Sequence, residues 1–322
     1  GTDGTFTGDI FAPKISEVTA VTTPTGDTTP NYTFSSNEAG TIAYGGSCSS
    51  STTSANADNN TITFNTLSGG TYSNCTITVT DSLNNVSNNL TVSSFILDTT
   101  APSLSQVTAV ATPTSDNTSS YTFFSTLPGA INYGGSCDSD NNTAVAGNNN
   151  ITFNALAEGT YSNCKISVTD DNNSNTSDNL SVSSFTIDIT APTLSSVTIA
   201  SSNSVSTLAK TGDNITLSVT SSEAIQTPIV SIAGQAATET GDNVTWSAAY
   251  TMTNSNTEGS VILNIVFSDL AGNPGSAVTS TTNGSAVRFD KTVPTLSNVT
   301  IASNNTLYTT MAKTGDNITL SI

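Results

Sequence analysis

The sequence predicts an all-β protein of tandem β-sandwich domains arranged end to end, and three observations support this prediction. Apolar residues alternate with Thr, Ser, Asn or Ala over short segments, which is the period of a strand with one buried face. No segment sustains the spacing of an amphipathic helix. The same motifs return at fixed offsets along the 322 residues, so the chain is an array of repeats and not one large core.

Composition restricts both the surface and the chemistry of the protein. Thr, Ser and Asn number 60, 49 and 36, whereas only 9% of the residues are charged, far below the usual ~25%. The 24 acidic and 6 basic residues give a net charge of −18, which argues against nucleic acid or an anionic membrane surface as a partner and favours a cation. Because the chain has no histidine, the commonest general base and a usual zinc ligand, metallohydrolase and Ser-His-Asp chemistry are excluded, and we expect the chain not to be an enzyme.

Segments for membrane insertion or export are not apparent. No apolar stretch approaches the ~20 residues of a membrane span, and no signal-peptide pattern begins at Gly1. We therefore expect no membrane span in this segment and, for an exported protein, an export signal outside it.

Residues 10–98 and 99–188 are two copies of one repeat, which we call type A. The match persists through the unit, since Pro13 returns as Pro102, residues 44–48 as 133–137, and 70–75 as 159–164. Residues 1–9 align with the end of the first copy, and we interpret them as the last strand of a preceding repeat of the same kind.

A second repeat, type B, covers residues 189–290. Its segments return in the last part of the chain, 193–201 as 295–303 and 209–217 as 312–320. Residues 291–322 are therefore the first strands of a further type B repeat, which stops about two strands in. We expect the chain to be a window on a longer protein.

Each type A repeat contains about seven short strands. Clusters of Gly, Asn, Ser and Asp separate alternating segments, and in the first copy the inward-facing pairs are Tyr32/Phe34, Ile42/Tyr44, Ile62/Phe64, Ile77/Val79 and Leu90/Val92. Seven strands in roughly 90 residues are typical of an immunoglobulin-like sandwich. Tyr72, before the sixth strand, resembles the corner tyrosine of that fold.

Several motifs resemble the Ig-like repeats of large bacterial cell-surface proteins: Asp-x-Thr-Ala-Pro at 98–102, Glu-Ala turns at 38–39 and 223–224, and Asp-Leu-Ala-Gly-Asn at 269–273. Such repeats build the stalks of giant adhesins, and similar domains occur in surface-layer proteins. The resemblance covers nearly the whole chain and implies the fold. It says less about purpose, because function sits in sites and not in folds.

The four cysteines form one pair per type A repeat, and both pairs are 27 residues apart: Cys48 with Cys75, and Cys137 with Cys164. The first cysteine of each pair continues the inward parity of the third strand, and the second shares that of the sixth. We predict one disulfide in each repeat, which would require an oxidising, extracellular or cell-surface location. Two buried free thiols are the alternative, and a metal site would need more ligands nearby.

Acidic residues recur at the predicted domain junctions. In a seven-stranded sandwich the second-to-third and sixth-to-seventh strand loops lie at the pole beside the preceding linker. The linker and these loops contribute Asp9, Glu38 and Asp81 in the first repeat, and Asp188, Glu223, Asp269 and Asn273 in the third. Oxygen ligands from several segments are what Ca²⁺ prefers, so we hypothesise an interdomain calcium ion that fixes the angle between domains.

The second repeat departs from this pattern. Leu127 stands at the position of the Glu, whereas Asp170 and Asp171 are expected near Asp98. Asp290 begins a fourth junction. The alternative interpretation is that all these acidic residues only form Asx turns and caps in loops.

Together these features predict a mechanical role. We expect a stalk or spacer of a secreted or cell-surface prokaryotic adhesin, whose partners are further Ig-like repeats of the chain or copies of itself, with any surface or glycan ligand bound by a domain outside this segment. The alternative is a subunit of a surface lattice (S-layer), sheath or extracellular filament. A carbohydrate-binding module would need an exposed aromatic platform, and the chain has one Trp.

Overall fold

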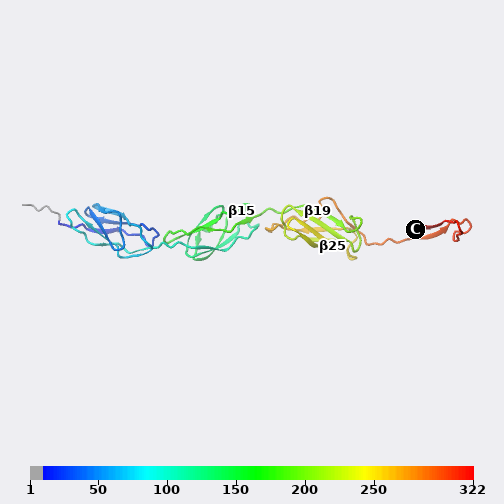
Figure 1. Ribbon diagram of the computed structural model, residues 1–322, viewed down its shortest axis with the longest axis horizontal. Coiled ribbons are helices and arrows are strands. Elements are labelled where there is room, and N and C mark those ends of the chain that lie inside the picture. The colour runs from blue at the N-terminus through cyan, green and yellow to red at the C-terminus, as the bar shows by residue number, and fades with distance from the viewer. Residues whose placement is uncertain (1–9) are drawn as a thin grey trace, which may run out of the picture. The chain divides into compact units, whose positions relative to one another are not determined.

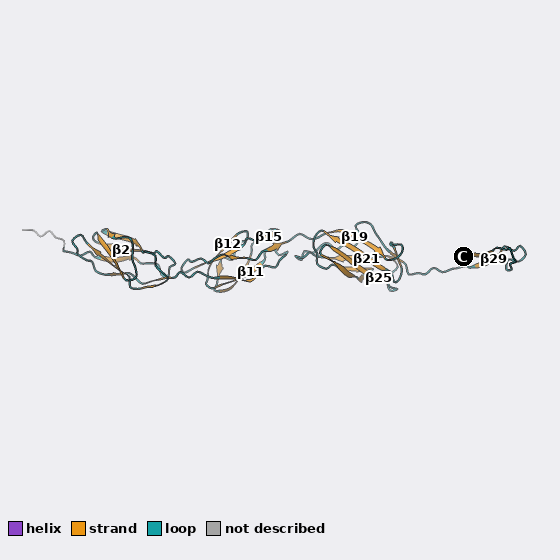
Figure 2. Ribbon diagram, viewed as in Figure 1, coloured by secondary structure: helices purple, strands orange, loops and turns teal. Residues whose placement is uncertain are grey.

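The computed structural model describes residues 10–322, and these residues contain strands, turns and loops but no helix (Figures 1 and 2). The predicted all-β class is confirmed. Within the described range there is accordingly no helix that could cross a membrane. The chain divides into two compact units, one ending at Ile189 and one beginning at Thr190, and each is described by itself. The strand predicted in residues 1–9 and the predicted ligand Asp9 lie outside the described residues.

The first unit contains two sandwiches, each around its own core. In the first sandwich one sheet has the order β1-β2-β5 and the other β4-β3-β7-β8, while a short β6-β9 pair extends the β7-β8 hairpin. The strands are β1 (Ile15–Thr19), β2 (Asn31–Ser36), β3 (Gly40–Gly45), β4 (Ser54–Ala55), β5 (Asp58–Thr63), β6 (Gly70–Tyr72), β7 (Thr76–Thr80), β8 (Leu90–Thr91) and β9 (Phe95–Leu97).

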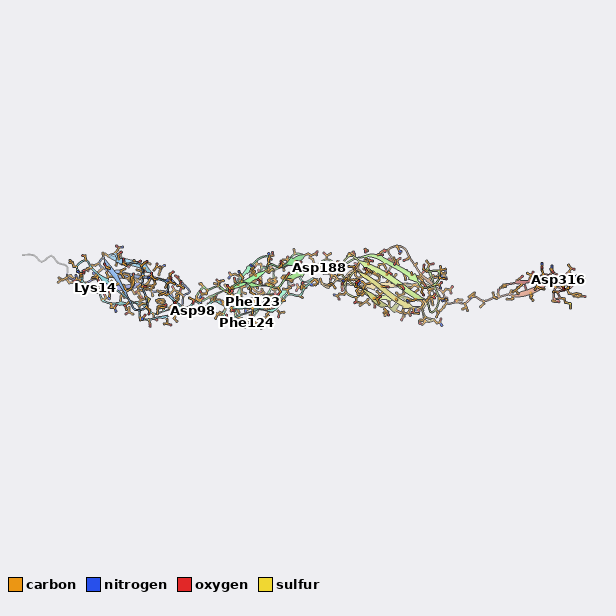
Figure 3. The ribbon with its side chains drawn as sticks, in the orientation of Figure 1. Lys14, Asp98, Phe123, Phe124, Asp188 and Asp316 are labelled. Carbon is orange, nitrogen blue, oxygen red and sulfur yellow. A yellow bond between two sulfur atoms is a disulfide. The ribbon has the colours of Figure 1, made fainter. Side chains whose placement is uncertain are left out.

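The second sandwich repeats this topology. Its sheets have the orders β10-β11-β14 and β13-β12-β16-β17, with a β15-β18 pair. The strands are β10 (Leu104–Thr108), β11 (Ser120–Ser125), β12 (Gly129–Gly134), β13 (Thr143–Ala144), β14 (Gly147–Thr152), β15 (Gly159–Tyr161), β16 (Lys165–Asp170), β17 (Leu180–Ser181) and β18 (Phe185–Ile187). Phe123 and Phe124, labelled in Figure 3, are neighbours in β11 on opposite faces, since Phe123 is fully buried and Phe124 is exposed.

A row of stacked aromatic rings forms the centre of each of these two cores. In the first sandwich Tyr32 stacks on Phe64, Phe64 on Phe95, and Phe95 on Tyr72, with ring centroids 5.1–6.2 Å apart. The Tyr72 hydroxyl donates to the Ser68 carbonyl at 2.8 Å. This is the bond of a tyrosine corner, so the ring of Tyr72 packs on the core while its hydroxyl fixes the preceding turn.

The second unit contains a third sandwich with a separate core between Val197 and Phe289. Its sheets have the orders β19-β21-β25-β24, β23-β22-β27 and β20-β28-β26. The strands are β19 (Leu194–Ser201), β20 (Leu208–Ala209), β21 (Asn214–Ser221), β22 (Ile229–Ile232), β23 (Gln235–Ala236), β24 (Thr238–Asp242), β25 (Thr245–Thr251), β26 (Gly259–Ser260), β27 (Leu263–Val266) and β28 (Arg288–Phe289).

The chain closes with a two-stranded hairpin of β29 (Thr300–Ser303) and β30 (Ile318–Ser321). It keeps the register of the first hairpin of the third sandwich, because Ile301 pairs with Leu320 as Ile199 pairs with Leu217. Ile301 and Leu320 are nevertheless 71% and 58% exposed. The hairpin therefore has the local structure of a type B repeat without a core to cover it.

Candidate functional site

Both predicted disulfides are present. Cys48 is bonded to Cys75 and Cys137 to Cys164, with a Cα–Cα distance of 5.2 Å in each case. Each bond joins a residue just after β3 or β12 to a residue just before β7 or β16, and all four side chains are buried. Both bonds close a loop with a sequence separation of 27. A loop of this length lowers the entropy of the unfolded chain, which stabilises each sandwich by about 3–4 kcal/mol.

The turn before each disulfide depends on glycine. Gly46 has a φ of +75°, and a Cβ at this position would lie 1.9 Å from the carbonyl oxygen of Asn74. The Asn74 side chain accepts a hydrogen bond from the Ser47 N–H at 3.2 Å, and Asn163 accepts one from Ser136 at the same distance. The repeated motifs around the cysteines are therefore required for the close approach of two backbone segments.

Two of the acidic residues predicted as ligands organise the loop that follows β7 in the first sandwich and the loop that follows β27 in the third. Asp81 accepts hydrogen bonds from the N–H groups of Leu83 and Asn85 at 2.8 and 2.9 Å and from the Asn85 side chain at 2.8 Å. The Asn85 side chain is the main cause that holds the pKa of Asp81 below its usual value. Asp269 accepts the corresponding bonds from the main chain and side chain of Asn273 at 2.8 and 2.7 Å.

The bond from Leu83 to Asp81 is an Asx turn, as in the alternative interpretation. The bonds of Asp269 come from a residue four positions later, and they coexist with a second carboxylate. Glu223 and Asp269, both in the second unit, have carboxylate oxygens within 4.8 Å of one another. Glu223 is half-buried and Asp269 is only 1% exposed. A close carboxylate pair of low exposure fits a hard cation in its donor chemistry.

The other predicted ligands form hydrogen bonds with neighbouring residues of different kinds. Asp188 follows the last strand of the first unit and donates its N–H to the Thr114 carbonyl at 3.0 Å. Glu38 accepts a hydrogen bond from the Asn37 side chain at 3.1 Å. Asp290 is exposed and accepts one from the Thr292 N–H at 2.9 Å.

At the junction inside the first unit, three acidic residues were predicted near the linker. Figure 3 shows Asp98 between the first and second sandwiches. Its side chain accepts a hydrogen bond from the Thr100 N–H at 2.9 Å, and hydrogen bonds from Thr100 and then from Asn173 hold its pKa below the usual value. Asp170 is buried and accepts a bond from its own loop, while Asp171 is exposed. In the described range these three carboxylates do not form a close group of ligand atoms.

Two amide side chains that the sequence did not single out hold this linker. The Asn175 side chain donates to the Asp98 carbonyl at 2.7 Å, and both Asn173 and Asn175 donate to the Thr100 carbonyl at 3.4 Å. Asparagine is so common in this chain that composition gave no signal for either residue.

Comparisons with known proteins assign the chain to no family. No protein-family model matches the chain, and no curated protein matches it. Among solved structures, a three-domain immunoglobulin segment of titin in a glutamate-to-alanine variant has a TM-score of 0.36 and 12% identity, over 88% of this chain and all of that one. A second titin tandem has a TM-score of 0.29 and 9% identity, over 86% of this chain and all of that one.

Proposed function

We propose that this chain is a structural segment, a stalk or spacer, of a large secreted or cell-surface prokaryotic adhesin, and that it has no catalytic role. The observation that carries the proposal is the repetition of one stabilising device, because two successive sandwiches close the same loop with the same buried disulfide. Disulfides persist in oxidising compartments, which supports an extracellular location. A segment of this kind presents a terminal binding domain, which lies outside these residues, at a distance from the cell.

The second part of the proposal is that calcium fixes a junction of the array. Support comes from the Glu223 and Asp269 pair, whose oxygens are close and of which Glu223 is half-buried and Asp269 buried. The sequence supplies Asp188 in the preceding linker as a further carboxylate. Ca²⁺ takes six to eight oxygen ligands from separate segments, so it would oppose rotation of one domain against the next.

The test is small-angle X-ray scattering of the full chain in millimolar Ca²⁺ and then with chelator, at several protein concentrations. For a stalk with calcium-fixed junctions, removal of calcium should decrease the maximum dimension or broaden the distribution of intramolecular distances. The apparent mass should not depend on protein concentration.

The alternative role, a subunit of a lattice, sheath or filament, gives the opposite result. Its lateral contacts between copies would raise the apparent mass with concentration, whether or not calcium is present. That outcome would remove the stalk from consideration, and a calcium-independent monomer would remove the junctional ion.

A further inference from the structure

The first and second sandwiches, both inside the first unit, are joined by a linker that a loop of the second sandwich holds. The loop residues are Asn173 and Asn175, which lie between β16 and β17. Their side chains donate to the carbonyl oxygens of Asp98 and Thr100 at 2.7–3.4 Å. Asn173 is only 4% exposed. An amide buried in this way is fixed in orientation by its hydrogen bonds.

The first sandwich reaches the same loop through Gly26, in the turn between β1 and β2. A Cβ at this position would lie 2.2 Å from the carbonyl oxygen of Asn173 and 2.8 Å from the side-chain oxygen of Asn175. Gly26 does not have a positive φ. Its own backbone conformation would therefore accept other residues, and the obstacle to a side chain is the neighbouring sandwich.

The equivalent turn of the second sandwich carries a side chain, because Ser115 occupies the position that corresponds to Gly26. The two turns have the same hydrogen bond at 3.1 Å from an Asp N–H to the hydroxyl of the Thr two residues earlier, Asp27 to Thr25 and Asp116 to Thr114. The turn thus tolerates a side chain. The glycine is needed at position 26 because Asn173 and Asn175 approach it closely.

The holding loop also differs from its counterpart in the first sandwich. Between the bridge partners Thr80 and Val86 there are five residues, whereas six separate Thr169 from Thr176. In the shorter loop the amide of Asn85 donates to Asp81 of the same loop. In the longer loop the corresponding amide, that of Asn175, donates instead to the linker.

We infer that the second sandwich binds the preceding sandwich of the same chain through a joint that needs no metal ion. The joint consists of residues 173–175, the carbonyl oxygens of the linker and Gly26, and the side-chain amides of Asn173 and Asn175 hold it in place. Leu127 replaces the acidic residue present at this pole of the other repeats, and Asp170 is engaged in its own loop. At this junction direct hydrogen bonds therefore fix the angle between two domains, which calcium is proposed to do at the junction of the second and third sandwiches. The contacts of the joint do not depend on the proposed function, whereas its role in keeping a stalk extended does.

The test measures the distance between the first and second sandwiches in the full chain. Spin labels are attached through non-canonical amino acids at the exposed positions Asn59 and Asn148, so that the disulfides stay intact, and the distance distribution is recorded by pulsed electron paramagnetic resonance. We expect one narrow distribution that is the same with calcium and with chelator. Asn175→Ala and Gly26→Val should each lose it, since one removes the hydrogen bonds and the other inserts a side chain into the contact.

The matched controls are Asn85→Ala, which alters the equivalent amide in the first sandwich, and Ser115→Val, which alters the equivalent turn. Both should keep the narrow distribution, and circular dichroism should show that all four variants are folded. A distribution that broadens on chelation, or that survives both Asn175→Ala and Gly26→Val, would overturn the inference. If the scattering does not change on chelation while the distance distribution here stays narrow, the junctional calcium of the proposed function is contradicted and this joint is not.

Discussion

At the scale of single residues, one position in each type A repeat links the first strand to the segment just before the last strand. Glu17 accepts hydrogen bonds from the main chain and hydroxyl of Ser93 at 2.9 and 2.7 Å. In the second sandwich Gln106 accepts from the Ser183 N–H at 3.1 Å and donates to its hydroxyl at 2.9 Å. The same contact is therefore made once by a titratable group and once by a neutral one.

This difference makes the first sandwich more sensitive to acid at that position. Partial burial raises the pKa of Glu17, but hydrogen bonds, chiefly those from Ser93, outweigh it and lower the pKa below the usual value of 4.5. A carboxyl group with a lowered pKa in the folded state contributes stability above its unfolded pKa, and that stability is lost as the pH falls through the folded pKa.

We therefore predict that Glu17→Gln, which copies the second sandwich, reduces the loss of stability of the first sandwich between about pH 6 and about pH 3. Hydrogen exchange of the β2 amides under denaturant measures this loss. The second sandwich in the same molecule is the control and should respond alike in both proteins. An identical pH dependence of the two proteins would show that the carboxylate contributes nothing.

At the scale of elements, the three sandwiches differ in how their cores are closed. The first two have a disulfide and a row of stacked aromatic rings. The third has no cysteine, and its core is mainly aliphatic with Phe267 and Phe289. Trp246 is half-buried, and its ring N–H donates to the Asn243 carbonyl at 3.2 Å. Sandwiches of one chain should thus respond differently to reduction.

Reduction, or replacement of Cys48 and Cys75 together by Ala, should destabilise the first sandwich by about 3–4 kcal/mol, because the unfolded chain regains the entropy of an open loop. Amide hydrogen exchange, followed separately for the peptides of each sandwich, measures this loss of stability. The third sandwich is the internal control, since it should be unaffected by reductant. Equal effects on all three would indicate a general effect of the reductant and not the loss of a bond.

The terminal hairpin allows a second comparison between elements. Its strands β29 and β30 pair in the register of β19 and β21, but Ile301 and Leu320 are exposed where Ile199 and Leu217 are buried. A two-stranded hairpin alone is marginally stable. We predict that amides of β29 and β30 exchange with solvent far faster than the equivalent amides of β19 and β21, as measured by mass spectrometry. Equal protection would mean that something covers the hairpin in solution.

At the scale of the whole molecule, the proposed mechanical role depends on junctions and not on cores. Each core is closed within its own sandwich. Substitutions in a linker should therefore alter the orientation of domains without unfolding them. The junctions differ in chemistry, with amides at the first and carboxylates proposed for the second.

We predict that Asp188→Ala loosens the junction between the second and third sandwiches while each domain stays folded, because it removes a carboxylate proposed to bind the junctional calcium. Small-angle scattering in Ca²⁺ should show a broader range of dimensions than the wild type, and thermal unfolding should be unchanged. Asp171→Ala, at an exposed acidic residue of the second sandwich, is the matched control. Unchanged scattering of Asp188→Ala would count against the ion.

The sequence by itself determined the fold class, the repeats and the pairing of the cysteines. These follow from local period, since residues such as Tyr32 and Phe34 alternate with polar neighbours and are both fully buried. The sequence also brought Glu223 and Asp269 to one pole, because strand order fixes which loops meet.

Only the tertiary structure decided what Gly26 and Asn175 do. Their contact joins residues far apart in the chain, from two sandwiches, through a backbone oxygen and an amide that occur everywhere in this composition. Periodicity reports which side of a strand is buried, and it carries no information on which loop of one domain approaches another. A joint made of common polar groups becomes visible only when the distances between them are known.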